Sequence, residues 1–132
     1  MAATIVAGAH SVPYQQLLLE SFTRNRALDK QNAHPNAISD DFDRFGLDVW
    51  QRVDAARKGN DERRKKLWAL ITWRNAIAHY DIDAKLSKDA LVPSTITLDT
   101  CTGWRSALGI LAVSLDKVVA DHCESLGLAR PW

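Results

Sequence analysis

The stretch CTGWRSALGILAVSLDKVVADHCESL, residues 101–126, is the longest regular pattern in the chain. Apolar residues recur in it every three or four positions, which is the spacing that puts side chains on one face of an α-helix. That face consists of Cys101, Trp104, Leu108, Leu111, Ala112, Leu115, Val118, Val119, His122 and Leu126. Gly127 follows at the position of a C-terminal capping glycine. The pattern therefore predicts a long helix that ends at residue 126.

Two further helical stretches are expected before residue 60. The first covers residues 14–29, where leucines and a phenylalanine recur at helical spacing. The second covers residues 39–59, with Ser39 as its N-cap and an apolar stripe along one side. Gly46 interrupts this stripe and is expected to mark a kink.

A third stretch, residues 60–79, carries a charge on its apolar stripe. The stripe consists of Leu67, Leu70, Ile71, Arg74, Ile77 and Ala78. A charge at such a position has to be buried with a partner or face a second subunit, because an unpaired buried charge costs several kcal/mol. The sequence leaves both placements open for Arg74.

The segment between the last two helices, residues 80–97, is rich in turn-forming residues and predicts an irregular connection. Residues 95–98 alternate in polarity, so they form either a short strand or the approach to a helix capped by Thr97. With long helices and almost no strand signal, the chain predicts an all-α fold. We expect one domain over residues 1–132, a bundle of about four main helices.

The composition excludes several classes of protein. Of the 132 residues, 46% are hydrophobic, which favours a folded domain over a disordered chain. No apolar run approaches the ~20 residues of a membrane span, so no membrane partner is expected. The N-terminus lacks the basic region of a signal peptide, so the cytoplasm is the expected location. A net charge of +1 argues neither for nor against nucleic-acid binding.

Sequence patterns for cofactors and metals are missing. The chain has no glycine-rich phosphate loop, no HExxH, no GxSxG and no CxxC. Cys101 and Cys123 lie in no metal-ligand or disulfide spacing and are expected to be small buried hydrophobic residues. We therefore expect no cofactor and no metal site.

The residues best suited to chemistry lie in WRNAIAHYD, residues 73–81. Asn75 and His79 are four positions apart and share one face of a helix. Arg74 lies about 140° from His79 around an ideal helix, but its long side chain can reach the same cleft. Arginine binds phosphate bidentately, and imidazole transfers protons near neutral pH. These groups suit phosphodiester cleavage in RNA, which supplies its own 2′-hydroxyl nucleophile; the alternative is an arginine paired with an acid and a histidine that caps the helix.

The string RNAIAH, residues 74–79, resembles the signature of the HEPN domain family, in which a His follows an Arg and a usually polar residue after a short spacer. Its position at the end of a predicted helix is also the position in that family. WQRV, residues 50–53, and the helix over residues 97–123 are similar to the RiboL-PSP-HEPN-like branch. The resemblance extends along the chain, and RNAIAH is its specific part.

This resemblance implies a small helical bundle that dimerises so that two motifs face one cleft. It implies a metal-independent endoribonuclease, often a toxin of a toxin–antitoxin or phage-defence system. Arg74 would hold the scissile phosphate, and His79 would transfer protons at the 2′-oxygen or the leaving 5′-oxygen. Asn75 would orient the phosphate or His79, and the products would be a 2′,3′-cyclic phosphate and a 5′-hydroxyl. The expected partners are RNA, a second copy of the chain and a cognate antitoxin protein.

The chain departs from one group of HEPN toxins. Where a nucleotidyltransferase antitoxin controls the toxin, a Tyr lies two residues beyond the His; here that residue is Asp81, and Tyr80 follows His79 directly. Modification of a Tyr by such a partner is therefore not expected. A second class of function stays open, a non-catalytic HEPN-like module that binds RNA, a nucleotide or a protein and uses Arg74 structurally.

Basic residues at the start of the third helix offer a path for an RNA backbone. The residues expected to bind RNA are Arg63, Arg64, Lys66 and Tyr80. The alternative for the basic run is an ordinary solvated helix face.

Three further side chains are assigned to packing. Trp68 and Trp73 flank the motif and are expected to be core or dimer contacts rather than base-stacking platforms, because tryptophan buries a large area. His122 lies on the apolar face of the last helix and is expected to be a core histidine with satisfied hydrogen bonds.

Overall fold

The computed structural model describes residues 16–17, 19–20, 23–24 and 26–131. Within these residues six helices can be bounded, and no strand forms. The helices are α2 (Ala27–Gln31), α3 (Pro35–Asp43), α4 (Val49–Ala56), α5 (Asn60–Ala78), α6 (Ile82–Leu86) and α7 (Leu98–Ser125). The predicted all-α fold is confirmed. None of these helices is long and apolar enough to cross a bilayer.

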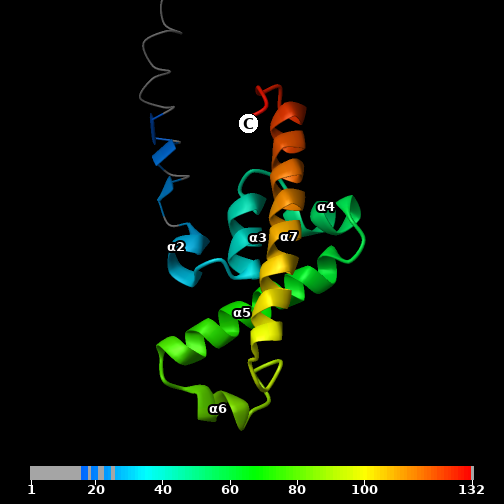
Figure 1. The fold of residues 1–132 in the computed structure, drawn as a ribbon. Helices are drawn as coiled ribbons and strands as arrows, with labels where there is room; N and C mark the ends of the chain where they lie inside the picture. The colour runs from blue at the N-terminus through cyan, green and yellow to red at the C-terminus, as the bar shows by residue number, and fades with distance from the viewer. Residues whose placement is uncertain (1–15, 18, 21–22, 25, 132) are drawn as a thin grey trace, which may run out of the picture.

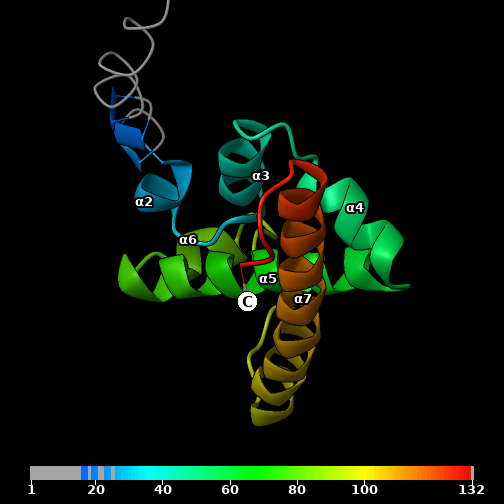
Figure 2. The same cartoon turned by 90° about the horizontal axis from the view of Figure 1, so that it is seen from above.

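The long helix α7 is the axis on which the other elements are arranged (Figure 1). Helix α5 crosses α7 steeply instead of running alongside it, as two perpendicular views show (Figures 1 and 2). Both α4 and α5 pack against α7, and α3 packs against α4, α5 and α2. Helix α6 lies beyond the C-terminal end of α5, at the same end of the molecule as the start of α7 (Figure 1).

The crossing of α5 and α7 divides the buried apolar side chains into two clusters. The first consists of Ile38, Leu47, Val49, Trp50, Val53, Leu67, Ile71, Leu111 and Val118. The second consists of Ala69, Trp73, Ala76, Leu91 and Trp104. Helix α5 contributes to both clusters, with Leu67 and Ile71 on one side and Ala69, Trp73 and Ala76 on the opposite side.

The N-terminus of α7 carries a reciprocal cap. The Thr97 hydroxyl accepts a hydrogen bond from the Thr100 backbone N–H at 3.1 Å, and the Thr97 N–H donates to the Thr100 hydroxyl at 3.4 Å. Of the two structures expected for residues 95–98, the approach to a capped helix is therefore the one that forms. At the other end, Gly127 adopts φ +75°, the left-handed conformation expected of a capping glycine.

The second predicted stretch forms two helices instead of one kinked helix. The N-cap of α3 is His34, whose Nδ1 accepts from the Asn36 N–H at 3.2 Å, so Ser39 as N-cap was wrong. Pro35 occupies the first helical position, where its missing N–H costs nothing, and this lets the helix begin upstream of Ser39. Helix α3 ends at Asp43, and Gly46 has φ +71° in the turn that follows, a conformation that cannot continue an α-helix.

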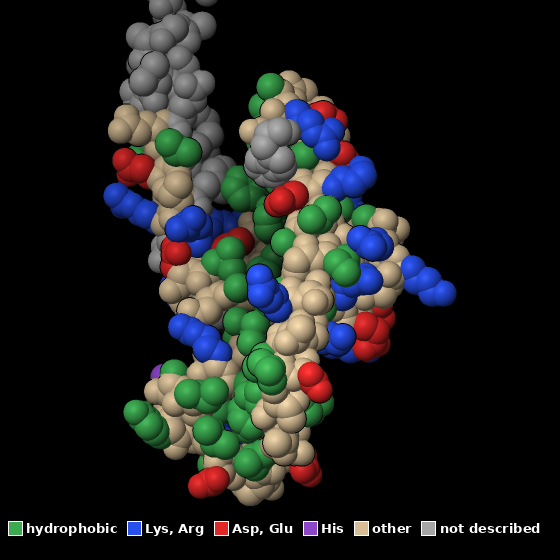
Figure 3. All heavy atoms as spheres, viewed as in Figure 1, with side chains coloured by type: hydrophobic (Ala, Val, Ile, Leu, Met, Phe, Trp, Pro, Cys, Tyr) green, Lys and Arg blue, Asp and Glu red, His purple; other side chains and the backbone are tan. Residues whose placement is uncertain are grey.

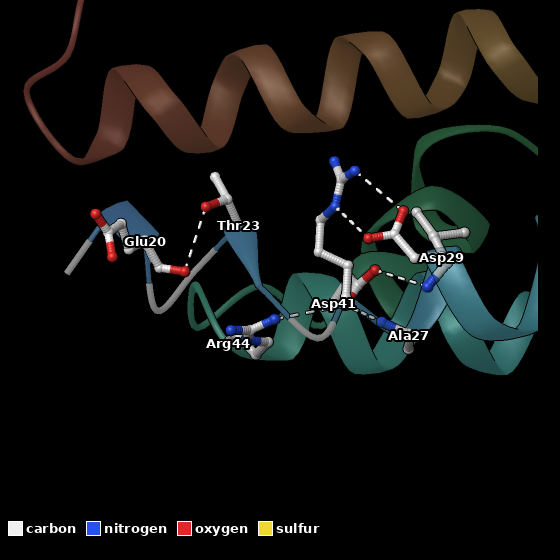
Figure 4. A network of polar contacts seen from close by, with 8 residues as sticks. Glu20, Thr23, Ala27, Asp29, Asp41 and Arg44 are labelled. Carbon is white, nitrogen blue, oxygen red and sulfur yellow. Dashed lines mark hydrogen bonds and ion pairs between the residues drawn. The ribbon is translucent and has the colours of Figure 1, made fainter. Parts of the chain in front are cut away.

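The first predicted stretch is also interrupted, at Arg26, whose extended ψ of 138° precedes the short α2. Residues 14, 15, 18, 21, 22 and 25 of this stretch lie outside the described part of the chain. The Asp41 carboxylate of α3 accepts hydrogen bonds from the N–H groups of Ala27 and Leu28 at 2.7 and 3.0 Å (Figure 4). An acidic side chain from a neighbouring helix thus caps the start of α2.

The same contacts set the ionisation of Asp41. Burial disfavours the charged carboxylate, but the N–H donors of Leu28 and Ala27, together with the charges of Arg44 and Arg26, outweigh that effect. They hold the pKa of Asp41 below its ordinary value.

Two packing predictions have mixed outcomes. His122 is buried and its Nε2 lies 3.0 Å from the Phe45 carbonyl, as expected of a core histidine, although its Nδ1 has no hydrogen-bond partner. Cys101 is exposed and Cys123 is half-buried, so burial was wrong for Cys101. Cys101 lies in the first turn of α7 and lines an open hollow together with Leu70 of α5.

Candidate functional site

Helix α5 positions the RNAIAH motif, and its first turn is anchored by side chains. Asn60 is fully buried, and its side-chain amide donates to the Val53 carbonyl at 2.7 Å. The Arg63 guanidinium donates to the Lys58 carbonyl and to the Asn60 side chain, both at 3.0 Å. Arg63, predicted to bind RNA, is thereby engaged in the turn between α4 and α5.

The motif occupies the last turn of α5. His79 is the C-cap, and its backbone N–H donates to the Asn75 carbonyl at 3.0 Å. Tyr80 adopts φ +54° and reverses the chain, after which the Asp81 N–H donates to the Ala76 carbonyl at 3.1 Å. This ending projects the Tyr80 side chain outward, with 96% of its surface exposed.

The three predicted catalytic side chains lie at or near the surface. Arg74 and His79 are exposed and Asn75 is half-buried. The Arg74 guanidinium lies 3.4 Å from the Asn75 side-chain oxygen and, among the described residues, forms no ion pair with an acid. The structure thus brings Arg74 and Asn75 together, whereas no hydrogen bond within the described chain joins the His79 ring to either of them.

The apolar stripe around Arg74 is covered in its first half only. Leu67 and Ile71 are buried in the first core cluster. Leu70 is half-buried, and Ile77 is 52% exposed on the other side of Arg74. Because α5 turns Trp73 and Ala76 into the second core cluster, the later part of the predicted stripe faces away from the core. Of the two placements left open for Arg74, burial within the chain is therefore not the one observed.

One half-buried residue of this stripe, Leu70, lies beside side chains of α7. Leu70 lines a hollow of about 340 Å³ together with Cys101, Trp104, Arg105 and Leu108 of α7. Leu98, one turn before Cys101 on α7, is 82% exposed. We name Leu70, Ile77, Leu98, Cys101 and Leu108 the apolar face. Figure 3 shows hydrophobic side chains gathered in the lower part of the view, where α6, the end of α5 and the start of α7 lie.

The basic run at the start of α5 does not form one continuous track. Arg64 pairs with Asp54 of α4 at 3.0 Å and lies over the Trp50 ring, 5.3 Å from its centroid. Lys65 pairs with Glu62 at 2.6 Å, and that hydrogen bond and charge raise the pKa of Lys65. Lys66 is exposed and has no ion pair with any described residue.

The two tryptophans of α5 differ in burial. Trp73 is buried, and its indole N–H donates to the Pro93 carbonyl at 2.9 Å, which confirms a core role. Trp68 is 42% exposed, so it is not a core residue, and the other expected role, a dimer contact, stays a prediction. A helical wheel could have found this, because Trp68 lies away from the apolar stripe and beside Arg64 and Asn75.

No metal cluster is found in the described part of the chain, where no three His, Cys, Asp or Glu side chains come together. Comparison with known proteins identifies no relative, because no family model, no curated protein and no solved structure matches the chain.

Proposed function

We propose that the chain is a homodimeric, metal-independent endoribonuclease that cleaves RNA with Arg74, Asn75 and His79, as the resemblance to HEPN domains implies. The observation that carries the proposal is the position of Arg74. It lies between Leu70 and Ile77 on the apolar face, exposed and without an acidic partner among the described residues. A cation in that setting is free to bind a phosphate and lies where a second copy would pack.

A second copy accounts for the exposed apolar side chains. Burial of apolar surface contributes roughly 25 cal/mol per Å², so covering the apolar face favours association. In a twofold dimer the same patch packs on both subunits. Because Arg74 lies within that patch, association through it would bring the Arg74 side chains of the two subunits toward one another, with each His79 at the C-terminal end of the same helix.

The proposed reaction needs only these side chains and the RNA. The Arg74 guanidinium binds the scissile phosphate and stabilises the charge that develops on it. One His79 accepts the proton of the 2′-hydroxyl as the 2′-oxygen bonds to phosphorus. The bond from phosphorus to the 5′-oxygen breaks, and the second His79 of the dimer donates a proton to that oxygen. The products are a 2′,3′-cyclic phosphate and a 5′-hydroxyl.

Asn75 has a positioning role in this proposal. Its amide oxygen lies within 3.4 Å of the Arg74 guanidinium, which restricts the orientation of that side chain. We place the enzyme among toxins or phage-defence effectors, with RNA as substrate and a cognate antitoxin protein as a second partner.

The test is cleavage of labelled RNA in EDTA by the parent protein and by Arg74→Ala and His79→Ala. Both side chains are exposed, so the variants are expected to keep the thermal stability of the parent. Each is expected to cleave at least about 100-fold more slowly, and only the parent should yield cyclic phosphate ends at appreciable rate. Arg57→Ala, which removes an exposed arginine outside the motif, is the matched control.

Two results would contradict the proposal. Equal cleavage by all four proteins would assign the activity to another site or to a contaminating nuclease. Failure of the parent to cleave any of several RNAs, with the fold intact, would favour the non-catalytic binding module.

A further inference from the structure

A second candidate site lies near the start of α5, away from the RNAIAH motif. It is a hollow of about 250 Å³ lined by Pro35, Asn36, Trp50, Arg64, Lys65 and Trp68. Its volume is below the ~300–1,000 Å³ of sites for drug-sized molecules, so it suits a single planar group more than a whole cofactor.

The walls of the hollow are held in place by contacts between helices. The indole N–H of Trp50 donates to the Pro35 carbonyl at 2.8 Å, and Trp50 is almost fully buried. Arg64 is fixed between Asp54 and the Trp50 ring. Trp68 differs from these groups, because 42% of its surface remains exposed and its indole N–H has no partner among the described residues.

The chemistry of the hollow favours a nucleotide. An exposed indole provides a stacking surface for any base. Lys65 lines the same hollow, and its ion pair with Glu62 is exposed on both sides, 69% and 64%, so a phosphate can replace the carboxylate at little cost. Pro35 and Asn36 begin α3, whose positive end also favours an anion.

The hollow shares one face of α5 with two residues of the motif, Asn75 and His79, whereas Arg74 lies about 80–140° from these positions around the helix. At about 100° per residue, positions 64, 68, 75 and 79 fall within roughly 60° of one another. Trp68 and His79 are 11 positions apart, which is roughly 16 Å along the helix axis. A single strand that passes the motif can therefore reach Trp68 within a few nucleotides.

We propose that this hollow is a subsite for single-stranded RNA, in which one base stacks on Trp68 and the adjoining phosphate lies beside Lys65. The inference rests on the proposed function, because it takes RNA as the ligand. Leu70 and Ile77 point to the opposite side of α5 from Trp68, so a dimer formed through the apolar face leaves the hollow open to solvent.

The test is a binding measurement that needs no cleavage. The full-length protein is titrated into a fluorescent 2′-O-methyl RNA oligonucleotide, which lacks the nucleophile, and anisotropy gives the Kd. Trp68→Leu keeps an apolar side chain without the ring and is expected to weaken binding about tenfold. Trp68→Phe keeps a ring and should weaken it by no more than about threefold. A duplex of the same sequence should bind without dependence on Trp68.

Lysine variants test the phosphate contact. Lys65→Ala is expected to reduce the slope of log Kd against log salt concentration by about 0.7, the value for one phosphate contact on a single strand. Lys117→Ala is the matched control, because Lys117 also makes a 2.6 Å ion pair within one helix, to Asp121, and does not line the hollow. Its slope should equal that of the parent.

Several results would overturn the subsite. If Trp68→Leu and the parent bind the oligonucleotide with equal affinity, Trp68 does not form a subsite. A shift in the monomer–dimer equilibrium of Trp68→Leu, with RNA affinity unchanged, would assign Trp68 to a protein contact instead. Cleavage assays separate the two proposals. If the parent protein binds RNA through Trp68 but never cleaves it, the proposed nuclease activity is refuted and the subsite is not. If Trp68→Leu cleaves RNA and binds it with the affinity of the parent, the subsite is refuted and the nuclease activity is not.

Discussion

Arg74 is the side chain on which the proposed chemistry depends most. It is exposed and close to Asn75, so its guanidinium can approach a phosphate without losing a structural contact. Arg74→Lys keeps the charge but loses the planar fork of donors. We expect single-turnover cleavage to fall at least about tenfold, with an unchanged melting temperature. Full activity in the lysine variant would show that a positive charge alone suffices.

Asp41 illustrates a side chain whose role is structural. Asp41→Asn removes the charge that caps α2 and is expected to lower the free energy of unfolding by about 1–2 kcal/mol at pH 7. Urea unfolding measures the loss. Asp43→Asn, an exposed acid on the same helix, should change stability by less than about 0.5 kcal/mol.

The contribution of Asp41 also depends on pH. Since folding lowers its pKa, the contribution is fully present above the unfolded-state pKa of about 3.9 and is lost as pH falls through the lower native value. The stability difference between the parent and Asp41→Asn should therefore shrink below about pH 4. A difference that stays constant down to pH 2 would show that the charge of Asp41 is not what stabilises α2.

Among the helices, α7 depends on its N-terminal cap. Thr97→Ala removes the hydroxyl that accepts the Thr100 N–H and is expected to cost about 1 kcal/mol. Thr102→Ala removes an exposed hydroxyl that donates within the helix to the Leu98 carbonyl, and it should cost less than about 0.5 kcal/mol. Chemical unfolding of the two variants checks the difference, and equal losses would contradict the capping role.

Helix α5 shows why one apolar stripe did not identify one buried face. On one side Leu67 and Ile71 pack in the cluster that α3, α4 and α7 share. On the opposite side Trp73 and Ala76 pack with Leu91 and with Trp104 of α7. A helix that crosses its neighbour can contact different elements on different sides. The apolar residues left over are then exposed, among them Ile77 within the motif itself.

At the scale of the whole molecule, the apolar face predicts self-association. Ile77→Lys puts a charge in this face and is expected to convert the proposed dimer into a monomer at micromolar concentration, since a buried unpaired charge costs several kcal/mol. Sedimentation velocity measures the change. Cleavage should fall with dimerisation if both subunits form the active site.

A matched substitution distinguishes the apolar face from other exposed surface. Val113 is 66% exposed, on a side of α7 away from Cys101 and Leu108. Val113→Lys should leave the dimer and the cleavage rate unchanged. A parent that is monomeric at all concentrations yet cleaves RNA would contradict the composite site.

Local patterns were sufficient for several features. Thr97 caps α7 and Gly127 lies beyond its end, because capping depends on residues within one or two turns. The position of the motif at the end of α5 is also a local feature, because Tyr80 and Asp81, which follow the helix, are its direct neighbours in the chain.

Contacts between distant segments decided the rest. The Arg64–Asp54 pair joins two helices, and Asp41 caps a helix that begins 14 positions before it. Whether Trp68 is buried depends on which helices lie beside α5, and periodicity within α5 does not contain that information. Propensity and spacing therefore determined the helical class and the position of RNAIAH. The crossing of α5 over α7 decided which of its side chains are buried and which are exposed, because burial depends on the neighbours that surround a surface.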